Sequence, residues 1–219
     1  GFVGRVSRNY GDVLRPTLEL IGPDESAHCV VGCYMMNVKG RTIFLADATV
    51  NVYPDSRTLA EIAVQTAKVA RRFGVAPRVA MLSFSNFGSS RAQRSERIED
   101  AIEFARELDP SLVIDGPMQA DTALNGDVQT EYPFMDFKGP ANVLVLPNLA
   151  AANIAYKLLE ELGDAEMTGP ILEGMDKPVQ LVARQDGVRH IVNMAAICAA
   201  DAIRQDSYWE TLVTPNIDG

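Results

Sequence analysis

The sequence has few of the residues and patterns that mark several common classes of protein. Its 219 residues include two histidines, three cysteines and one tryptophan. No run approaches the roughly 18 uncharged apolar residues that a membrane-spanning helix needs, and the first residues, GFVGRVSRNY, lack the layout of a secretion signal. An odd number of cysteines without such a signal argues against a disulfide framework. We therefore expect a cytoplasmic protein with no membrane segment.

Positive charge is also scarce. Lys and Arg number 20 against 29 Asp and Glu, which gives a formal net charge of −9. Nucleic acids are held by clustered Lys and Arg, so no nucleic-acid partner is expected. Cys29 and Cys33 have a spacing that two zinc ligands can have, but a tetrahedral site needs four ligands and the only histidines are His28 and His190. We interpret the cysteines as buried thiols and expect no metal.

The remaining composition is that of a globular protein with a sizeable core. Hydrophobic residues make up 47% and charged residues 22% of the chain. The first 50 or so residues have extended character, and 29–38 and 41–50 are predicted to form a hairpin around Lys39 and Gly40. Residues 56–73 carry one apolar stripe, with Asp55 or Ser56 as N-cap and Gly74 just beyond the end, which predicts an amphipathic helix.

Strand and helix patterns then alternate. Short apolar runs at 78–85, 111–115, 141–147 and 177–183 predict strands, and helical patterns follow most of them, the last running from Val188 to about residue 205. Strands that are apolar throughout are buried on both faces. The pattern predicts an α/β fold, a three-layer α/β/α sandwich with a largely parallel sheet.

Ligands of open α/β sheets bind at the carboxyl ends of strands, so the residues after each strand are the candidates. A Ser/Gly-rich segment that begins at Ser83, after the apolar residues 78–82 of the first run, also holds Gly88 and Ser89. Asn148 follows the third run, and Arg184 follows the fourth. Such turns and a planar guanidinium suit phosphate or carboxylate groups. Motifs for dinucleotides, P-loops, hydrolase elbows and zincins are missing from the sequence. The residues alone indicate an α/β domain that binds a small anionic ligand.

Taken in order, these segments resemble the phosphate acetyl/butyryltransferase family. The matching stretches are LRPTLELIG (14–22), SFSNFGSS (83–90), DGPMQADTAL (115–124), ANVLVLPNLAAANIAYK (141–157), GPILEGMDKPVQLVARQ (169–185) and HIVNMAAIC (190–198). The resemblance implies a two-lobed, dimeric protein of the isocitrate/isopropylmalate dehydrogenase-like kind. It also implies transfer of an acyl group between CoA and phosphate.

The resemblance also assigns roles to positions, two of which have changed. The family's Ser-Arg pair falls on Ala183 and Arg184, and the carboxylate that deprotonates the CoA thiol falls on His190. Arg15 is placed to meet a CoA phosphate, and Lys138 precedes the ANV segment. Ala183 has no hydroxyl for a developing oxyanion, so the catalytic set is interpreted as degenerate.

The combination of the family's segments with changed catalytic positions is similar to the C-terminal domain of bacterial NADP-dependent malic enzymes. That resemblance implies a regulatory domain that binds acetyl-CoA, or a related CoA ester, as an effector and supports homo-oligomers. NADP and Mg or Mn would belong to malic and nucleotide-binding domains of a parent chain that oxidatively decarboxylates malate to pyruvate. The alternative is a working phosphate acetyl/butyryltransferase that uses His190 or Asp186 as base.

The expected domain organisation follows from the resemblance. The whole chain, 1–219, is read as one phosphotransacetylase-like domain shortened at its N-terminus. Lobe 2 is expected at about 25–175, the rest of lobe 1 at about 1–24 and 176–205, and a tail at 206–219.

Overall fold

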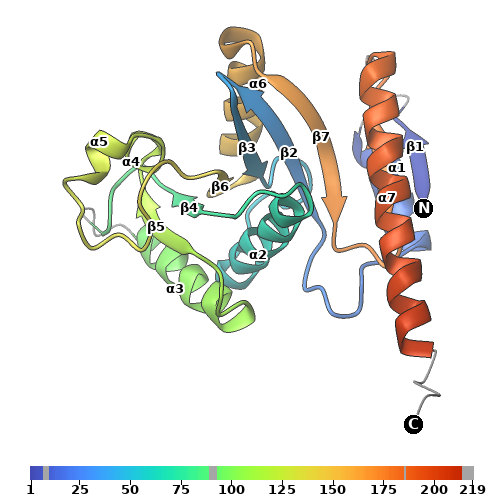
Figure 1. Cartoon of the computed structure of the whole chain (residues 1–219), viewed down its shortest axis with the longest axis horizontal. Coiled ribbons are helices and arrows are strands. Elements are labelled where there is room, and N and C mark those ends of the chain that lie inside the picture. Colours follow the sequence, from blue (N-terminus) through green and yellow to red (C-terminus); the bar gives the residue numbers. More distant parts are fainter. Residues whose placement is uncertain (7–9, 89–92, 185, 214–219) are drawn as a thin grey trace. The chain divides into compact units, whose positions relative to one another are not determined.

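The computed structural model of the protein describes residues 1–6, 10–88, 93–184 and 186–213. The chain divides into two compact units. Unit 1 comprises Gly1–Glu25 and Met175–Gly219, and unit 2 comprises Ser26–Gly174. Each unit has its own sheet (Figure 1).

Unit 2 is built on a six-stranded mixed sheet with the strand order β5-β4-β6-β3-β2-β7. The pairs β5–β4, β4–β6 and β6–β3 are parallel, whereas β2 runs antiparallel to both β3 and β7. Its elements are β2 (Val31–Val38), β3 (Arg41–Ala46), α2 (Ser56–Arg72), β4 (Val79–Leu82), α3 (Gln93–Leu108), β5 (Ile114–Met118), α4 (Ala120–Leu124), α5 (Gly126–Gln129), β6 (Val143–Val145), α6 (Leu149–Gly163) and β7 (Glu166–Glu173).

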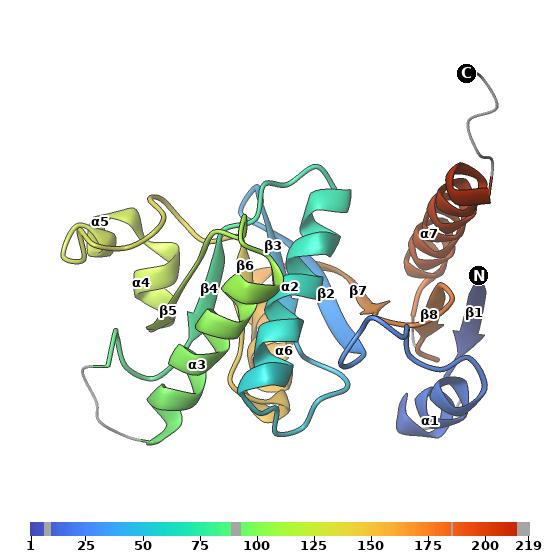
Figure 2. The same ribbon diagram turned by 90° about the horizontal axis from the view of Figure 1, so that it is seen from below.

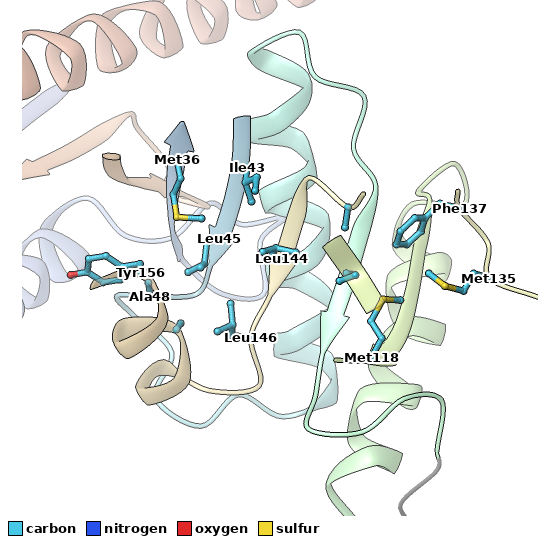
Figure 3. Close-up of a cluster of buried hydrophobic side chains, with 14 residues drawn as sticks. Met36, Ile43, Leu45, Ala48, Met118, Met135, Phe137, Leu144, Leu146 and Tyr156 are labelled. Carbon is cyan, nitrogen blue, oxygen red and sulfur yellow. The ribbon is translucent and has the colours of Figure 1, made fainter. Parts of the chain in front are cut away.

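Helices cover both faces of this sheet. Phe44 of β3 points toward α2, where its ring lies 6.0 Å from that of Phe73 just beyond the helix. Its neighbour Leu45 points the opposite way, into a buried cluster that includes Tyr156 of α6 and Met118 of β5 (Figure 3). Alternate residues of a strand face opposite sides of the sheet. Unit 2 is therefore layered, with α2 and α3 side by side on one face and α6 and α4 on the other (Figure 2).

Several local predictions are confirmed. The hairpin of β2 and β3 turns through Lys39 and Gly40, both with positive φ (50° and 72°), as a tight two-residue hairpin turn requires. Asp55 caps α2 by accepting a hydrogen bond from the backbone N–H of Thr58 at 2.8 Å. Gly74 follows the helix with φ of 75°. The α/β class is confirmed, and the sheet predicted to be largely parallel is mixed, with three parallel and two antiparallel strand pairs.

Other local predictions were wrong in detail. The strand expected at 111–115 begins at Ile114, because Asp109 accepts hydrogen bonds from the N–H and hydroxyl of Ser111 and holds those residues in a turn. Residues within the first 50 form a helix, α1 (Tyr10–Leu20), despite Pro16 inside it. The last helix, α7 (Val188–Val213), continues past residue 205.

Unit 1 contains a two-stranded parallel sheet, in which β1 (Phe2–Arg5) pairs with β8 (Val179–Val182), together with α1 and α7. The four residues of β8 are all buried. Met194 and Cys198 of α7 are buried as well. Among the helices that the structure describes, none is long and apolar enough to cross a membrane.

Candidate functional site

The end of strand β8 in unit 1 holds the predicted pair Ala183 and Arg184. Strand β8 ends at Val182 because the chain turns there, with the N–H of Asp186 donating to the carbonyl of Ala183 at 3.2 Å. Ala183 is half-buried and Arg184 is exposed. Arg184 is therefore an exposed residue directly beyond the strand, which is the position that the sequence predicted for it.

The carboxylate of Asp186 lies inside this turn. Its Oδ2 accepts a hydrogen bond from the backbone N–H of Ala183 at 2.6 Å. The same oxygen lies 3.4 Å from Nε2 of His190, and both side chains are about one-fifth exposed. Nε2 itself is shielded from solvent and makes no hydrogen bond to the parts of the chain that the structure describes. The structure thus brings Ala183, Asp186 and His190 together around one carboxylate oxygen.

Arg15 belongs to the same unit. It lies on α1, whose inner side is marked by the buried residues Leu14 and Thr17, and its own side chain is exposed. Thr17 donates its hydroxyl to the carbonyl of Val13 at 2.7 Å, which ties together the turn that Pro16 would otherwise loosen. Arg15 is consequently presented to solvent on an ordered helix.

In unit 2, the loop after β4 is fixed to the start of α4. The N–H of Ser83 donates to the carbonyl of Met118 at 2.8 Å. Asn86 is also bonded twice to Gln119: its Oδ1 accepts from the backbone N–H of Gln119 at 2.7 Å, and its Nδ2 donates to the side-chain Oε1 of Gln119 at 3.2 Å. Gly88 is exposed with φ of 72°, and Ser89 lies outside the described residues. The loop is an ordered platform up to Gly88.

Asn148 and Lys138, the other predicted positions in unit 2, are both engaged within the unit. Asn148 is the N-cap of α6, and its Oδ1 accepts from the N–H of Ala151 at 2.9 Å. Lys138 is exposed, and its Nζ donates to the carbonyl of Pro133 at 3.0 Å. These contacts give both side chains a defined direction.

Arg97 of α3 is a residue that the sequence reasoning missed. Its two terminal nitrogens donate to the carbonyls of Pro54 and Pro147, each at 2.9 Å. Pro54 precedes α2, and Pro147 follows β6, so one guanidinium joins two loops at the carboxyl edge of the sheet. The partners lie 43 and 50 residues away in sequence. Local patterns carry no signal for a contact of that kind.

A buried carboxylate, Asp47, closes the end of β3. Its two oxygens accept from the backbone N–H groups of Gly32, Thr49, Val50 and Asn51 and from the Asn51 side chain. Burial raises the pKa of Asp47, and the hydrogen bonds act in the opposite direction. The group organises the turn after β3 and joins it to β2.

The prediction of buried thiols is confirmed for Cys33 and Cys198, whereas Cys29 is half-buried. Burial raises the pKa of Cys29 to about 12, with nearby carboxylates adding to the effect, and raises the pKa of Cys33 as well. Cys33 and Cys198 are buried, and all three cysteines are free. Such thiols are poor nucleophiles at neutral pH.

Comparison with known proteins places this geometry in context. Residues 1–199 match the family described as Phosphate acetyl/butaryl transferase. The phosphate acetyltransferase of Bacillus subtilis (strain 168) is 39% identical over 93% of this chain and 63% of that protein. The NADP-dependent malic enzyme of Escherichia coli (strain K12) is 45% identical over 90% of this chain and 26% of that protein.

A solved structure of a related protein is also similar to this chain. The crystal structure of a phosphotransacetylase from Streptococcus pyogenes superposes with a TM-score of 0.86 at 36% identity, covering 92% of this chain and 62% of that one. The chain spans less than two thirds of the length of each of these relatives.

Proposed function

The chain belongs to the phosphate acetyl/butyryl transferase family, and we propose that within it the chain is a regulatory domain of an NADP-dependent malic enzyme. In this role it binds acetyl-CoA or a related CoA ester and supports a homo-oligomer, and it does not itself transfer acyl groups. Oxidative decarboxylation of malate, with NADP and a divalent metal, is assigned to other domains of the parent chain.

The observation that carries the proposal is the end of strand β8. Ala183 offers no hydroxyl where the family motif has serine, and its backbone N–H already donates to Asp186 at 2.6 Å. Loss of one donor to a developing oxyanion typically costs about 10²- to 10³-fold in rate. His190, at the position of the family's carboxylate, is directed at the same Asp186 oxygen. Both changes weaken acyl transfer, while the exposed Arg184 can still hold a ligand.

The relatives support the same choice. Identity to the E. coli malic enzyme is 45%, against 39% to the B. subtilis phosphate acetyltransferase, over nearly the same part of this chain. An exposed Arg15 and an exposed Arg184 in one unit suit a ligand with several negative phosphates, because guanidinium groups bind phosphate oxygens in pairs.

A second candidate is a working phosphate acyltransferase. It is favoured by the closeness of Asp186 and His190, whose Oδ2 and Nε2 atoms are 3.4 Å apart. An imidazole positioned beside a carboxylate is a candidate general base for a CoA thiol. In this reading the pair replaces the family's single carboxylate.

Thiol release from acetyl-CoA in the presence of phosphate separates the two functions. We expect the wild-type chain to show no turnover at ordinary enzymatic rates, on the order of 1–10³ s⁻¹. The double variant Ala183→Ser/His190→Asp, which restores the family's residues, is expected to be at least about 10²-fold faster than wild type. Turnover of the wild-type chain at an ordinary rate would favour the acyltransferase.

Calorimetric titration with acetyl-CoA tests the binding role. Micromolar binding that is lost in Arg15→Ala is the expected result. Arg5→Ala is the matched control, since it removes another exposed arginine of unit 1. No heat in any of the three proteins would contradict the proposal and favour a purely structural dimerisation domain.

A further inference from the structure

The carboxylate of Asp186 occupies the backbone N–H of Ala183 at the end of β8, where an N–H group could otherwise bind a ligand. Its Oδ2 is 2.6 Å from the Ala183 nitrogen and 3.4 Å from His190 Nε2. The main chain supports the same arrangement, because the N–H of Asp186 donates to the carbonyl of Ala183 at 3.2 Å. The turn is closed twice, once through the backbone and once through the side chain.

The hydrogen bond from Ala183 to this carboxylate differs from that of an ordinary helix cap. Helix α7 begins at Val188, and a cap residue would accept from N–H groups inside the first turn of that helix. Asp186 instead accepts from the residue three positions before it, at the end of β8. Its charge is therefore directed toward the strand end, beside Arg184.

We infer that Asp186 determines the class of ligand at this strand end, excluding a phosphate group and admitting an uncharged acyl carbonyl. The inference rests on the proposed function. A phosphate that approached Arg184 and the Ala183 N–H would lie within a few ångströms of the Asp186 carboxylate. Like charges about 4 Å apart near a protein surface weaken binding by up to about a thousand-fold. A carbonyl oxygen carries no net charge and escapes most of this penalty.

The inference adds to the loss of the serine hydroxyl. Removing that hydroxyl slows a transfer step but leaves a site that still accepts phosphate through arginine. An internal carboxylate removes the second substrate of acyl transfer. Together the two features make a site that can hold an acyl thioester and has no phosphate to give it to.

The test measures binding of inorganic phosphate to the full chain by calorimetry. The variants are Asp186→Asn and Asp186→Ser, which remove the charge but keep an acceptor for the Ala183 N–H. The matched control is Asp176→Asn, because Asp176 is an exposed carboxylate of the same unit. Circular dichroism spectra and melting curves establish that each variant is folded.

We expect each Asp186 variant to bind phosphate at least about tenfold more tightly than the wild type, after solvent and salt have screened part of the repulsion. Asp176→Asn should bind phosphate as weakly as the wild type. Equal or undetectable phosphate binding in all the folded proteins would overturn the inference, as would an equal gain in Asp176→Asn. Should one Asp186 variant fail to fold, the other decides.

Acetyl-CoA is titrated into the same samples, which separates this inference from the proposed function. If wild type binds acetyl-CoA and the Asp186 variants gain no phosphate binding, only the role of Asp186 fails. If wild type does not bind acetyl-CoA, the proposed function fails, and a gain of phosphate binding would still assign the exclusion of phosphate to Asp186. Tight binding of phosphate to wild type, in competition with acetyl-CoA, contradicts the inference directly.

Discussion

Asp47→Asn is expected to destabilise the protein substantially although it changes only one atom of the side chain. One Asp47 oxygen accepts from the N–H groups of Gly32, Thr49 and Val50, at 3.3, 2.8 and 3.1 Å. The other accepts from the N–H of Asn51 at 2.8 Å and from its side-chain amide. An asparagine amide has one oxygen, so its NH2 must face at least two donors.

The magnitude follows from the hydrogen bonds that cannot be replaced. In its better orientation the new amide keeps the three bonds of the first oxygen and loses both bonds from Asn51. Bonds to a charged group contribute about 1.5–3 kcal/mol each, so the loss is about 3–6 kcal/mol. Removing a buried charge offsets part of this, since burial raises the pKa of Asp47. A net decrease of about 2–4 kcal/mol in the free energy of unfolding remains.

Urea unfolding followed by circular dichroism measures the effect. The control is Asp55→Asn, because Asp55 is an exposed N-cap and Asn caps helices about as well as Asp. That variant should change the free energy of unfolding by less than about 0.5 kcal/mol. If Asp47→Asn were no more damaging than Asp55→Asn, the five-donor arrangement would not be the main source of order in the turn after β3.

Three further outcomes test other parts of the structure. Gly174→Ala should lower the free energy of unfolding by at least about 3 kcal/mol, because Gly174 has φ of 86° and the added Cβ would lie 2.6 Å from the carbonyl oxygen of Cys29. The control Gly22→Ala, at φ of 80° with open space around it, should cost about 1–2 kcal/mol in the same urea titration. Cys29 in the folded protein should react with iodoacetamide at pH 8 about a thousand-fold more slowly than an ordinary thiol, since a pKa of about 12 leaves little thiolate. The difference should vanish in urea, and fast labelling of the folded protein would contradict the raised pKa of this thiol. Arg97→Ala should lower the free energy of unfolding by about 2–3 kcal/mol through loss of two bonds to carbonyls, and an unchanged urea midpoint would show that the two loops hold without it.

Elements whose residues repeat at a regular spacing could be predicted from the sequence. Helix α2 has eleven buried residues and is bracketed by Asp55 and Gly74, so its period, start and end are all written locally. The β2–β3 hairpin is likewise local, because the Lys39-Gly40 turn joins strands adjacent in sequence. In the helix and in the hairpin, local propensity and burial favour the same structure, so the sequence pattern predicts it correctly.

Elements that depend on distant partners could not be predicted in the same way. Strand β1 pairs with β8, so Phe2 lies opposite Val179, and no local pattern sets that register. Helix α1 contains Pro16, which the period-based reading takes as a break. Strand β7 contains Gly169 with φ of 141°, which interrupts the alternation expected of a strand.

Some residues of the candidate site could likewise be predicted from local sequence, and others could not. Residues such as Asn148 and Arg184 could be named from the sequence because they directly follow apolar runs. The direction of the Asp186 side chain could not, since an aspartate four residues after a strand end can face the helix, the solvent or the strand. Only the turn geometry selects the strand, through the bond to Ala183.

The bond between Asp186 and Ala183 also affects which substitutions could restore acyl transfer at the end of β8. Restoring a serine at position 183 would supply a hydroxyl, yet the backbone N–H beside it would still donate to Asp186. The phosphate that must accept the acyl group would meet the same carboxylate. Direct transfer of an acetyl group to phosphate needs both substrates bound at once, so Ala183→Ser/His190→Asp should gain less than Ala183→Ser/Asp186→Asn/His190→Asp. The thiol-release assay at a fixed phosphate concentration compares them, and equal rates would mean that Asp186 leaves access of phosphate unchanged.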